Sequence, residues 1–170
     1  HLVDVPPEDL ETTLSEIRQG RFGGANVTIP HKRSAARQMD TLDPWAERSG
    51  SVNTICRRAD GSLHGMDTDG RGFLHSVTEE GVALHANSPI CLIGAGGSAT
   101  AVASALVESG LPQIHVATRT PANTPETLQN MAQSIQNLER TLEAPNLLIQ
   151  TTPVGMQVEP NSPQWAIALS

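Results

Sequence analysis

Lys32 is the only lysine in the sequence, and it follows the run NVTIPH at residues 26–31. A lysine amine can exchange a proton with a reacting hydroxyl group. The run places Lys32 in the first turn of a helix, which is an unfavourable position for a cation. This placement favours a chemical role. The alternative is a solvent-exposed lysine, since most lysines lie on the surface.

Asp69 is the natural partner of this lysine. A carboxylate near Lys32 would orient the amine and hold a substrate hydroxyl, which gives the acid/base pair that hydride transfer to or from a carbonyl needs. The alternative role of Asp69 is a plain N-cap of the helix that follows it, and the two roles are compatible. Asn53 is polar in an otherwise apolar run and therefore needs a partner from the protein or a substrate.

The run Gly94, Ala95, Gly96, Gly97, Ser98, Ala99 has the form G-x-G-x-x-A. It lies between a predicted strand at 90–93 and a predicted helix at 98–109. In this context the first glycine permits a sharp turn, the second lets the backbone approach a pyrophosphate, and the helix N-terminus offers free N–H groups. The pattern predicts a dinucleotide site, with a purely structural turn as the alternative.

The next predicted strand, 114–118, ends in Thr118, Arg119 and Thr120 without an acid. A site selective for NAD usually carries Asp or Glu there, to accept from the ribose 2′-hydroxyl. A guanidinium instead suits a 2′-phosphate, so Arg119 favours NADP over NAD. The alternative is a solvated loop arginine.

Helical spacing and turn residues predict the elements of the first half. We expect a helix through Leu10, Leu14 and Ile17, a strand at 25–29, and a helix after Pro30. A third helix should start at the cap Asp43 and end near residue 50, followed by a hairpin of strands 51–57 and 63–66 around the Asp60-Gly61 turn. Asp69 is placed to cap a helix that runs to residue 81.

The second half has the pattern of a parallel α/β unit. Beyond the strands and helix around the glycine run, 125–142 is predicted to be rich in helix and 146–151 to be a strand. The predicted fold class is therefore α/β. It comprises a partial N-terminal α/β substrate-binding domain at 1–86 and a partial Rossmann-like NADP-binding domain at 87–170.

The composition narrows the range of functions. The net charge is −7 and the basic residues are scattered, which argues against a nucleic-acid partner. No apolar stretch approaches a membrane span and the start lacks a leader pattern, so we expect a soluble, cytoplasmic protein without membrane contact. His31, His64, His75, His85 and His115 show no metal-ligand spacing, and no metal is predicted. Cys56 and Cys91 are expected to be reduced core residues.

The sequence resembles the shikimate dehydrogenase family from about residue 24 to residue 156. The resemblance is carried by an ordered set of runs: NVTIPHK, SVNT, DTDGRGF, GAGGSA, TRT and QTTPVGM. It implies NADP-dependent reduction of 3-dehydroshikimate to shikimate. We expect a monomer or homodimer, and the sequence does not decide between them. The resemblance also implies that Lys32 is the catalytic lysine, that Asp69 is its partner, and that Thr28 and Asn53 bind substrate hydroxyls. The implied cofactor residues are Gly94, Ala95, Gly96, Gly97, Ser98, Thr118, Arg119, Thr120 and Thr152.

Some positions depart from the family pattern. Asp67 stands where Asn is usual, Ser51 where Ala is usual and Thr118 where Asn is common, and the second basic residue expected just after Arg119 is missing. The family's carboxylate-binding serine pair would precede residue 1, and its nicotinamide-side residues would follow residue 170. The uncapped apolar run at 165–169 also suggests a longer protein, so we expect the 170 residues alone to be inactive. Two alternative functions stay open: a quinate or other hydroxy-acid dehydrogenase, and a non-catalytic regulator that senses a metabolite.

Overall fold

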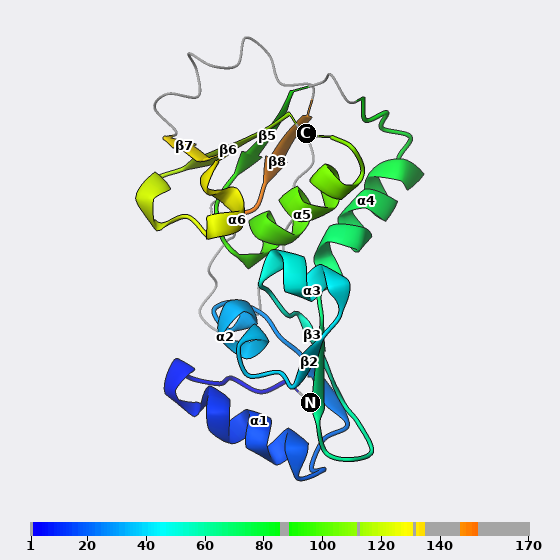
Figure 1. The fold of residues 1–170 in the computed structure, drawn as a ribbon, viewed down its shortest axis with the longest axis vertical. Coiled ribbons are helices and arrows are strands. Elements are labelled where there is room, and N and C mark those ends of the chain that lie inside the picture. Colours follow the sequence, from blue (N-terminus) through cyan, green and yellow to red (C-terminus); the bar gives the residue numbers. More distant parts are fainter. Residues whose placement is uncertain (1, 86–88, 112, 131, 135–146, 153–170) are drawn as a thin grey trace.

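A computed structural model describes residues 2–85, 89–111, 113–130, 132–134 and 147–152 of the chain. These residues form two α/β halves, each built on a four-stranded sheet (Figure 1). The predicted α/β fold class is confirmed. The predicted domain boundary at residue 86 lies at the edge of a segment outside the described residues, so the division into 1–86 and 87–170 stays a prediction.

The N-terminal half contains a short 3-10 helix, three helices and four strands, which Figure 1 draws from blue to green. In chain order they are η1 (Pro7–Asp9), α1 (Leu10–Arg18), β1 (Gly24–Asn26), α2 (Lys32–Ala36), β2 (Thr41–Leu42), α3 (Pro44–Ser49), β3 (Thr54–Arg57) and β4 (Leu63–Met66). The sheet has the order β1-β3-β4-β2. Its β1/β3 and β3/β4 pairs are antiparallel and its β2/β4 pair is parallel.

The predicted amphipathic helix is confirmed, because Leu10, Leu14 and Ile17 of α1 are all buried. They pack in one core with Ile55 of β3 and Leu63 of β4. Helix α3 starts as predicted: the Asp43 carboxylate accepts a hydrogen bond from Ala46 N at 2.7 Å. The Asp60-Gly61 turn joins β3 to β4, also as predicted.

The predicted strand at 25–29 is too long. Strand β1 ends at Asn26, and residues 28–31 form a turn in which His31 N donates to Thr28 O at 2.8 Å. The strand predicted at 51–57 likewise begins only at Thr54.

The C-terminal half is a parallel sheet with helices packed on it. Its elements are β5 (Ile90–Ile93), α5 (Gly97–Glu108), β6 (Ile114–Thr118), η2 (Pro121–Asn123), α6 (Glu126–Gln129), β7 (Ala132–Ser134) and β8 (Leu147–Gln150). The strand order is β7-β6-β5-β8, with all described pairs parallel. The strands predicted at 90–93 and 114–118 are confirmed to the residue.

The segment predicted to be helix-rich, 125–142, is only partly so. Helix α6 is a single short turn, and residues 132–134 form the edge strand β7 through pairing with β6. Residues 135–142 lie outside the described part of the chain, as does the apolar run at 165–169.

Helix α4 (Asp69–Glu79) packs along α5 and links the two halves (Figure 1). The two helices approach closely at Gly70, where a Cβ atom would come within 2.5 Å of Ala101 O. A second link is the ion pair between Arg48 of α3 and Glu108 of α5, at 2.9 Å. The halves therefore share a packed junction formed by α3, α4 and α5.

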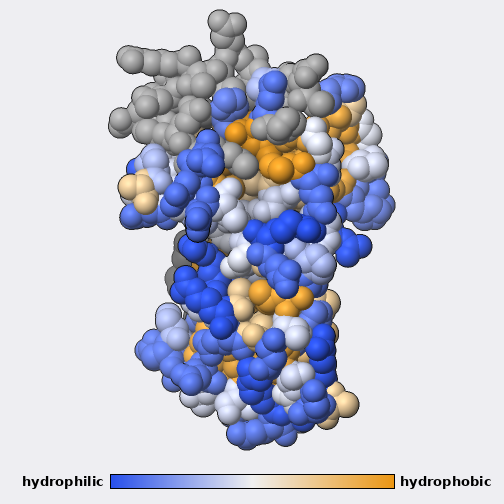
Figure 2. Space-filling view, viewed as in Figure 1, coloured by the Kyte–Doolittle hydropathy of each residue, from blue (hydrophilic) through white to orange (hydrophobic). Residues whose placement is uncertain are grey.

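Blue hydrophilic residues cover much of the face shown in Figure 2, and orange apolar patches lie over both halves. The exposed large apolar residues are likewise divided: Leu2, Val3 and Ile29 lie in the N-terminal half, and Val107 and Leu148 lie in the parallel-sheet half. Within the described ranges, no helix is long and apolar enough to cross a membrane.

Candidate active site

Lys32 is the first residue of α2, and only 7% of it is exposed to solvent. The backbone fixes this position, because Val52 N donates to Lys32 O at 3.0 Å. Lys32 is thereby tied to the segment that leads into β3. The alternative of a solvent-exposed lysine is ruled out by this burial.

The amine of Lys32 meets the carboxylate predicted to be its partner. Lys32 Nζ donates to Asp69 Oδ2 at 2.5 Å, and Asn53 Nδ2 donates to Asp69 Oδ1 at 2.6 Å. Both carboxylate oxygens are therefore engaged. We call Lys32, Asn53 and Asp69 the lysine cluster, and their sequence separations of 16 and 37 residues show that the fold assembles it.

Asp69 does not cap its helix in the way that the sequence predicts. The N-cap of α4 is Thr68, and Asp69 is the first helical residue. Its side chain reaches across to Lys32 and Asn53 instead. The ion pair is partly buried, with side-chain exposures of 8% for Lys32 and 27% for Asp69. A buried charge needs such a partner, because an unpaired charge is costly away from water.

Asn53 lies just before β3 and is tied to the start of α4. Its Oδ1 accepts from Thr68 N at 3.1 Å, and its Nδ2 donates to Thr68 Oγ1 at 2.9 Å. The sequence predicts that Asn53 needs a hydrogen-bond partner from the protein or from a substrate, and these bonds show that its amide has partners within the protein. The same bonds hold Asn53 beside the Asp69 carboxylate.

Residues 94–98, which we call the glycine turn, connect β5 to α5. Gly94 has a φ of 115°, and a Cβ atom there would lie 2.5 Å from Thr151 Oγ1. Only glycine adopts this conformation without strain. Gly96 is different, since its φ is −84° and, among the described residues, no atom beyond its chain neighbours would lie within 4 Å of a Cβ at this position. The backbone at Gly96 is therefore open to a ligand at the start of a twelve-residue helix.

The other predicted cofactor residues lie at the same edge of the parallel sheet. The register pairs Ile93 with Ala117 on one side and with Gln150 on the other, so the carboxyl ends of β5, β6 and β8 coincide. Thr152 lies near Gly94, whose Cβ would come within 2.9 Å of Thr152 Cγ2. In chain order the strands run from β5 through β6 to β7 on one side of β5, and the next strand, β8, pairs with β5 on its other side. Ligands bind α/β sheets at such switch points.

Arg119 and its neighbours follow β6 at this edge. Thr118 is buried and its Oγ1 accepts from Thr120 N at 3.4 Å, while Arg119 and Thr120 are exposed. The arginine is thus free to turn toward either a ligand or solvent. The geometry leaves both roles of Arg119 open.

The lysine cluster and the glycine turn meet. Lys32 Nζ donates to Ser98 Oγ at 3.2 Å, and a Cβ atom on Gly97 would touch the Lys32 side chain at 3.4 Å. An ammonium group has three N–H donors. Asp69 and Ser98 are the acceptors of Lys32 Nζ within the described residues, which leaves one donor for a third acceptor.

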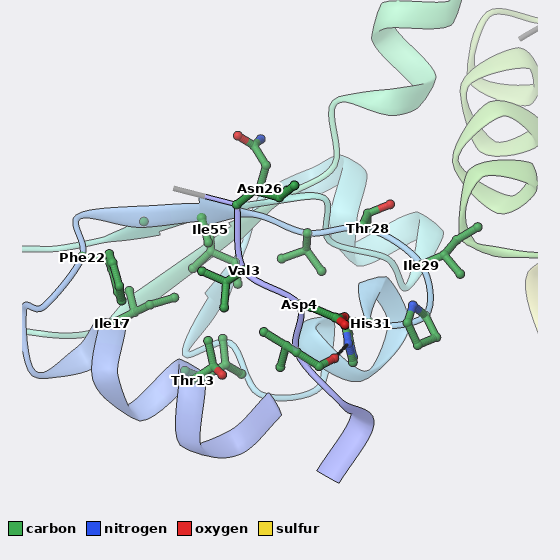
Figure 3. A pocket seen from close by; sticks show the side chains of 17 residues that line it. Val3, Asp4, Thr13, Ile17, Phe22, Asn26, Thr28, Ile29, His31 and Ile55 are labelled. Atoms are coloured by element: carbon green, nitrogen blue, oxygen red, sulfur yellow. Dashed lines mark hydrogen bonds between the residues drawn. The ribbon is translucent and has the colours of Figure 1, made fainter. Parts of the chain in front are cut away.

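Thr28 is separate from the lysine cluster in its side-chain contacts. It is exposed and lines a cavity of about 410 Å³ between the N-terminal segment, α1 and β1. Figure 3 shows Thr28 and Ile29 at one end of this cavity and Phe22 at the other. The neighbouring backbone is nevertheless tied to the cluster, because Val27 N donates to Asn53 O at 2.7 Å.

Asp67 and Ser49 lie next to the lysine cluster, and no role was predicted for either from the sequence. Asp67 is 2% exposed, and its Oδ2 accepts a hydrogen bond from Ser49 Oγ at 2.5 Å. Burial raises the pKa of the Asp67 carboxyl, and the Ser49 hydrogen bond partly offsets this effect. The one sequence signal for Asp67 was its departure from the family pattern.

Within the described ranges, no group of three or more His, Cys, Asp or Glu side chains could hold a metal ion. His31 hydrogen-bonds to Val5 O at 2.6 Å and His64 to Thr41 Oγ1 at 2.8 Å. Both cysteines are free thiols. Cys91 is buried as predicted, whereas Cys56 is exposed, because β3 has only one face on the core and Ile55 occupies it.

Two family models match the chain. Residues 1–55 match the shikimate dehydrogenase substrate binding domain, and residues 77–158 match shikimate / quinate 5-dehydrogenase. A shikimate dehydrogenase (NADP(+)) of Paramagnetospirillum magneticum is 39% identical over 163 residues, which cover 89% of this chain and 57% of that protein.

Solved structures give the same result. The shikimate 5-dehydrogenase of Thermus thermophilus in complex with NADP(H) and shikimate has a TM-score of 0.74 and 35% identity, over 90% of this chain and 56% of that one. The quinate dehydrogenase of Corynebacterium glutamicum in complex with NAD has a TM-score of 0.75 and 27% identity, over 91% and 58%.

A parallel sheet with a glycine turn at its switch point, joined to an α/β half that carries a buried lysine–aspartate pair, is typical of two-part α/β folds that bind dinucleotides at the edge of the sheet. The chain belongs to the shikimate dehydrogenase family. It spans 57% of the length of its Paramagnetospirillum relative.

Proposed function

We propose that the protein containing this chain is an NADP-dependent shikimate dehydrogenase, which interconverts 3-dehydroshikimate and shikimate. One observation carries the proposal: a buried lysine amine contacts both a carboxylate and the first turn of the helix that follows the glycine turn. Acid/base chemistry and a nucleotide site are thereby within one side chain of each other. The family membership and the shared runs of sequence support the same assignment.

Lys32 moves the proton in this proposal. In the direction of carbonyl reduction, its ammonium donates a proton to the oxygen of the substrate carbonyl, and in alcohol oxidation the amine takes the hydroxyl proton back. Asp69 holds Lys32 in place and supplies an acceptor for a substrate hydroxyl. Asn53 fixes the second carboxylate oxygen, and its side chain and that of Thr28 are the further candidates for binding substrate hydroxyls.

The glycine turn fits a dinucleotide. The open space around Gly96 and the N-terminus of α5 suit a pyrophosphate, for which backbone N–H groups are good donors. Thr118, Arg119, Thr120 and Thr152 would surround the adenosine ribose and its phosphate. When bound, the nicotinamide cofactor supplies or accepts the hydride. The absence of an acid after β6 supports NADP as the cofactor, with Arg119 as the 2′-phosphate ligand.

A second candidate function is a quinate dehydrogenase. The family model over residues 77–158 covers both activities by its description, and a quinate dehydrogenase shares the fold. A non-catalytic regulator is less well supported, because a sensor has no need of a buried lysine–carboxylate pair beside a nucleotide turn.

The experiment that tests the proposal is a substrate and cofactor matrix. The longer protein containing these residues is assayed with shikimate and with quinate, each with NADP and with NAD, and the 170-residue chain is assayed beside it. We expect the highest kcat/KM for shikimate with NADP, and no activity in the 170 residues alone. Preference for quinate would move the protein to the second function. No turnover with any pair, in a folded longer protein, would exclude the dehydrogenase proposal.

A further inference from the structure

Asp67 is a buried acid two residues before Asp69, and each of its carboxylate oxygens has a partner. Oδ2 accepts from Ser49 Oγ at 2.5 Å, and Oδ1 accepts from Asp69 N at 3.1 Å. Ser49 is the last residue of α3 and Asp69 is the first of α4, so this one side chain bridges two helices of the junction.

The bond to Asp69 N meets a need of helix α4. The first N–H groups of a helix have no partner inside it and are satisfied by nearby side chains or water. Thr68, the N-cap residue, makes no side-chain capping bond, and Asp67 accepts the Asp69 N–H two residues on, as in an Asx-turn. The Asp69 carboxylate is thereby left to Lys32 and Asn53.

The anchoring of Asp67 makes it a fixed point for the start of α4. Ser49, which holds it, is itself buried and also contacts the backbone of Ser51, whose N donates to Ser49 Oγ at 3.2 Å. The Asp67 amide donates to Asp43 Oδ1 at 3.3 Å. Main chain and side chain of Asp67 are therefore both held by α3 and its cap, on which α4 is then positioned.

We propose that Asp67 is a positioning residue for the Lys32–Asp69 pair. From its anchorage on Ser49 it fixes the backbone of Asp69, so that the Asp69 carboxylate lies within hydrogen-bonding distance of Lys32 Nζ. It acts through Asp69 and is not itself a catalytic residue. The effect on turnover rests on the proposed function, but the geometric effect on Lys32 does not.

The NMR signal of the Lys32 side chain reports directly on the Lys32–Asp69 contact. Labelling lysine with ¹³C at Cε gives one side-chain NMR signal from these 170 residues, because they contain a single lysine. In the longer protein this signal is assigned by its loss in Lys32→Arg. The position of the signal in Asp69→Asn shows what loss of the ion pair looks like.

Asp67→Ala and Asp67→Asn form the matched pair of variants. Alanine removes the acceptor for Asp69 N–H, so we expect the Lys32 signal to move toward its position in Asp69→Asn. We also expect kcat to fall on the order of tenfold or more with a smaller change in KM, as misplacement of a catalytic group does. Asparagine keeps an acceptor oxygen at the same place and should restore both the signal and most of kcat.

A folded Asp67→Ala protein whose Lys32 signal stays at the wild-type position would overturn the proposal, even if its denaturation midpoint falls. Circular dichroism establishes whether each variant folds. If Asp67→Ala does not fold, Ser49→Ala decides: it removes the anchor of Asp67, and an unmoved Lys32 signal in that variant overturns the proposal equally. If the parent protein has no dehydrogenase activity, the proposed function fails while the signal still decides this inference.

Discussion

The two parts of the candidate site are built from different materials. The lysine cluster is made of side chains that bond to one another, with both Asp69 oxygens and both polar atoms of the Asn53 amide engaged inside the protein. The glycine turn instead presents backbone groups and open space, and the exposed Arg119 lies at the same edge of the sheet. The lysine cluster is therefore held in place by contacts within the protein, whereas the glycine turn leaves space that a ligand could fill.

This difference sets what each substitution should do. In the lysine cluster, a change to one side chain leaves its partners unsatisfied and alters chemistry. At the edge of the parallel sheet, a substitution acts on backbone conformation or on ligand binding. Substitutions of two different glycines, Gly94 and Gly96, separate these two effects.

The largest expected effect is that of Lys32→Ala. In the full-length enzyme we expect kcat to fall on the order of a hundredfold or more, since positioned acid/base groups contribute about 10²–10⁴-fold. Substrate KM should change less. Steady-state kinetics check this result, with Lys32→Arg as a control that keeps the charge without a readily exchanged proton. An unchanged kcat in Lys32→Ala would end the assignment of Lys32 as the acid/base group.

Gly94→Ala and Gly96→Ala separate conformation from binding in the glycine turn. Alanine at Gly94 must adopt a φ of 115° and meets Thr151 Oγ1 at 2.5 Å, so we expect it to lose about 1–3 kcal/mol of stability or more. An alanine methyl group at Gly96 meets no atom within 4 Å in the described part of the chain, its chain neighbours aside. The Gly96→Ala variant should therefore fold with near wild-type stability and raise KM for the cofactor, because its methyl group occupies the space open to a pyrophosphate.

Urea unfolding and cofactor titration measure the two outcomes side by side. Equal stability of the two variants would mean that the turn does not demand glycine at residue 94. Unchanged cofactor affinity in Gly96→Ala would mean that no ligand approaches the backbone there.

Arg119→Ala tests the cofactor half without touching its fold. Arg119 is exposed, so stability should be unchanged. KM for NADP should rise by about tenfold or more, since a hydrogen bond to a charged group contributes about 1.5–3 kcal/mol. KM for NAD should stay nearly constant. Arg58→Ala, which makes the same charge change in the β3–β4 hairpin, is the control, and equal effects of Arg119→Ala on both cofactors would remove Arg119 as the 2′-phosphate ligand.

The same contrast decides how much the sequence predicts. The glycine turn is a contiguous pattern between β5 and α5, and its strand β5 was predicted to the residue. Edge strand β7 was not predicted, because residues 132–134 are Ala, Gln and Ser and form a strand only through pairing with β6. Local propensity carries no information about such a partner.

The lysine cluster was predicted residue by residue but not in its geometry. Asp69 was expected to cap α4 because capping is a local rule that a sequence reveals. In the fold, Asp67 accepts from the Asp69 N–H, and the Asp69 carboxylate contacts Lys32. The first contact is local, whereas the second depends on how α2 and α4 meet across 37 residues of sequence. The role of Ser49 in holding Asp67 spans 18 residues and has no sequence signal.

The last prediction concerns the pH dependence of stability that the buried Asp67 carboxyl causes next to the lysine cluster. Burial raises the pKa of the Asp67 carboxyl above its ordinary value of 3.8, against the smaller effects of the Ser49 and Asp69 N–H hydrogen bonds and of Lys32, and with a contribution from Asp69 in the same direction as burial. The folded chain therefore holds the Asp67 proton at pH values where the unfolded chain has lost it. Stability from this group is fully present below pH 3.8 and is lost as the pH rises through the folded pKa.

Asparagine at residue 67 cannot titrate, so Asp67→Asn should lack this loss. We expect the free energy of unfolding of Asp67→Asn, minus that of the wild type, to be constant at the lowest pH, to increase through the acid range, and then to level off.

Asp40 and Asp60 have the opposite effect, because hydrogen bonds from Leu63 N and Arg18 to Asp40, and from Ser62 to Asp60, lower the pKa values of these two carboxyls. Their contribution to stability is lost on acidification, but it is the same in both proteins and cancels in the difference. Urea unfolding across the pH range gives the difference. Ser51→Ala removes a buried hydroxyl that has no hydrogen-bond partner among the described residues and does not titrate, so its difference from the wild type should stay flat. A flat difference for Asp67→Asn as well would mean that the Asp67 carboxyl titrates alike in the folded and unfolded chains. Burial of Asp67 beside the lysine cluster would then have no effect on the pH dependence of stability.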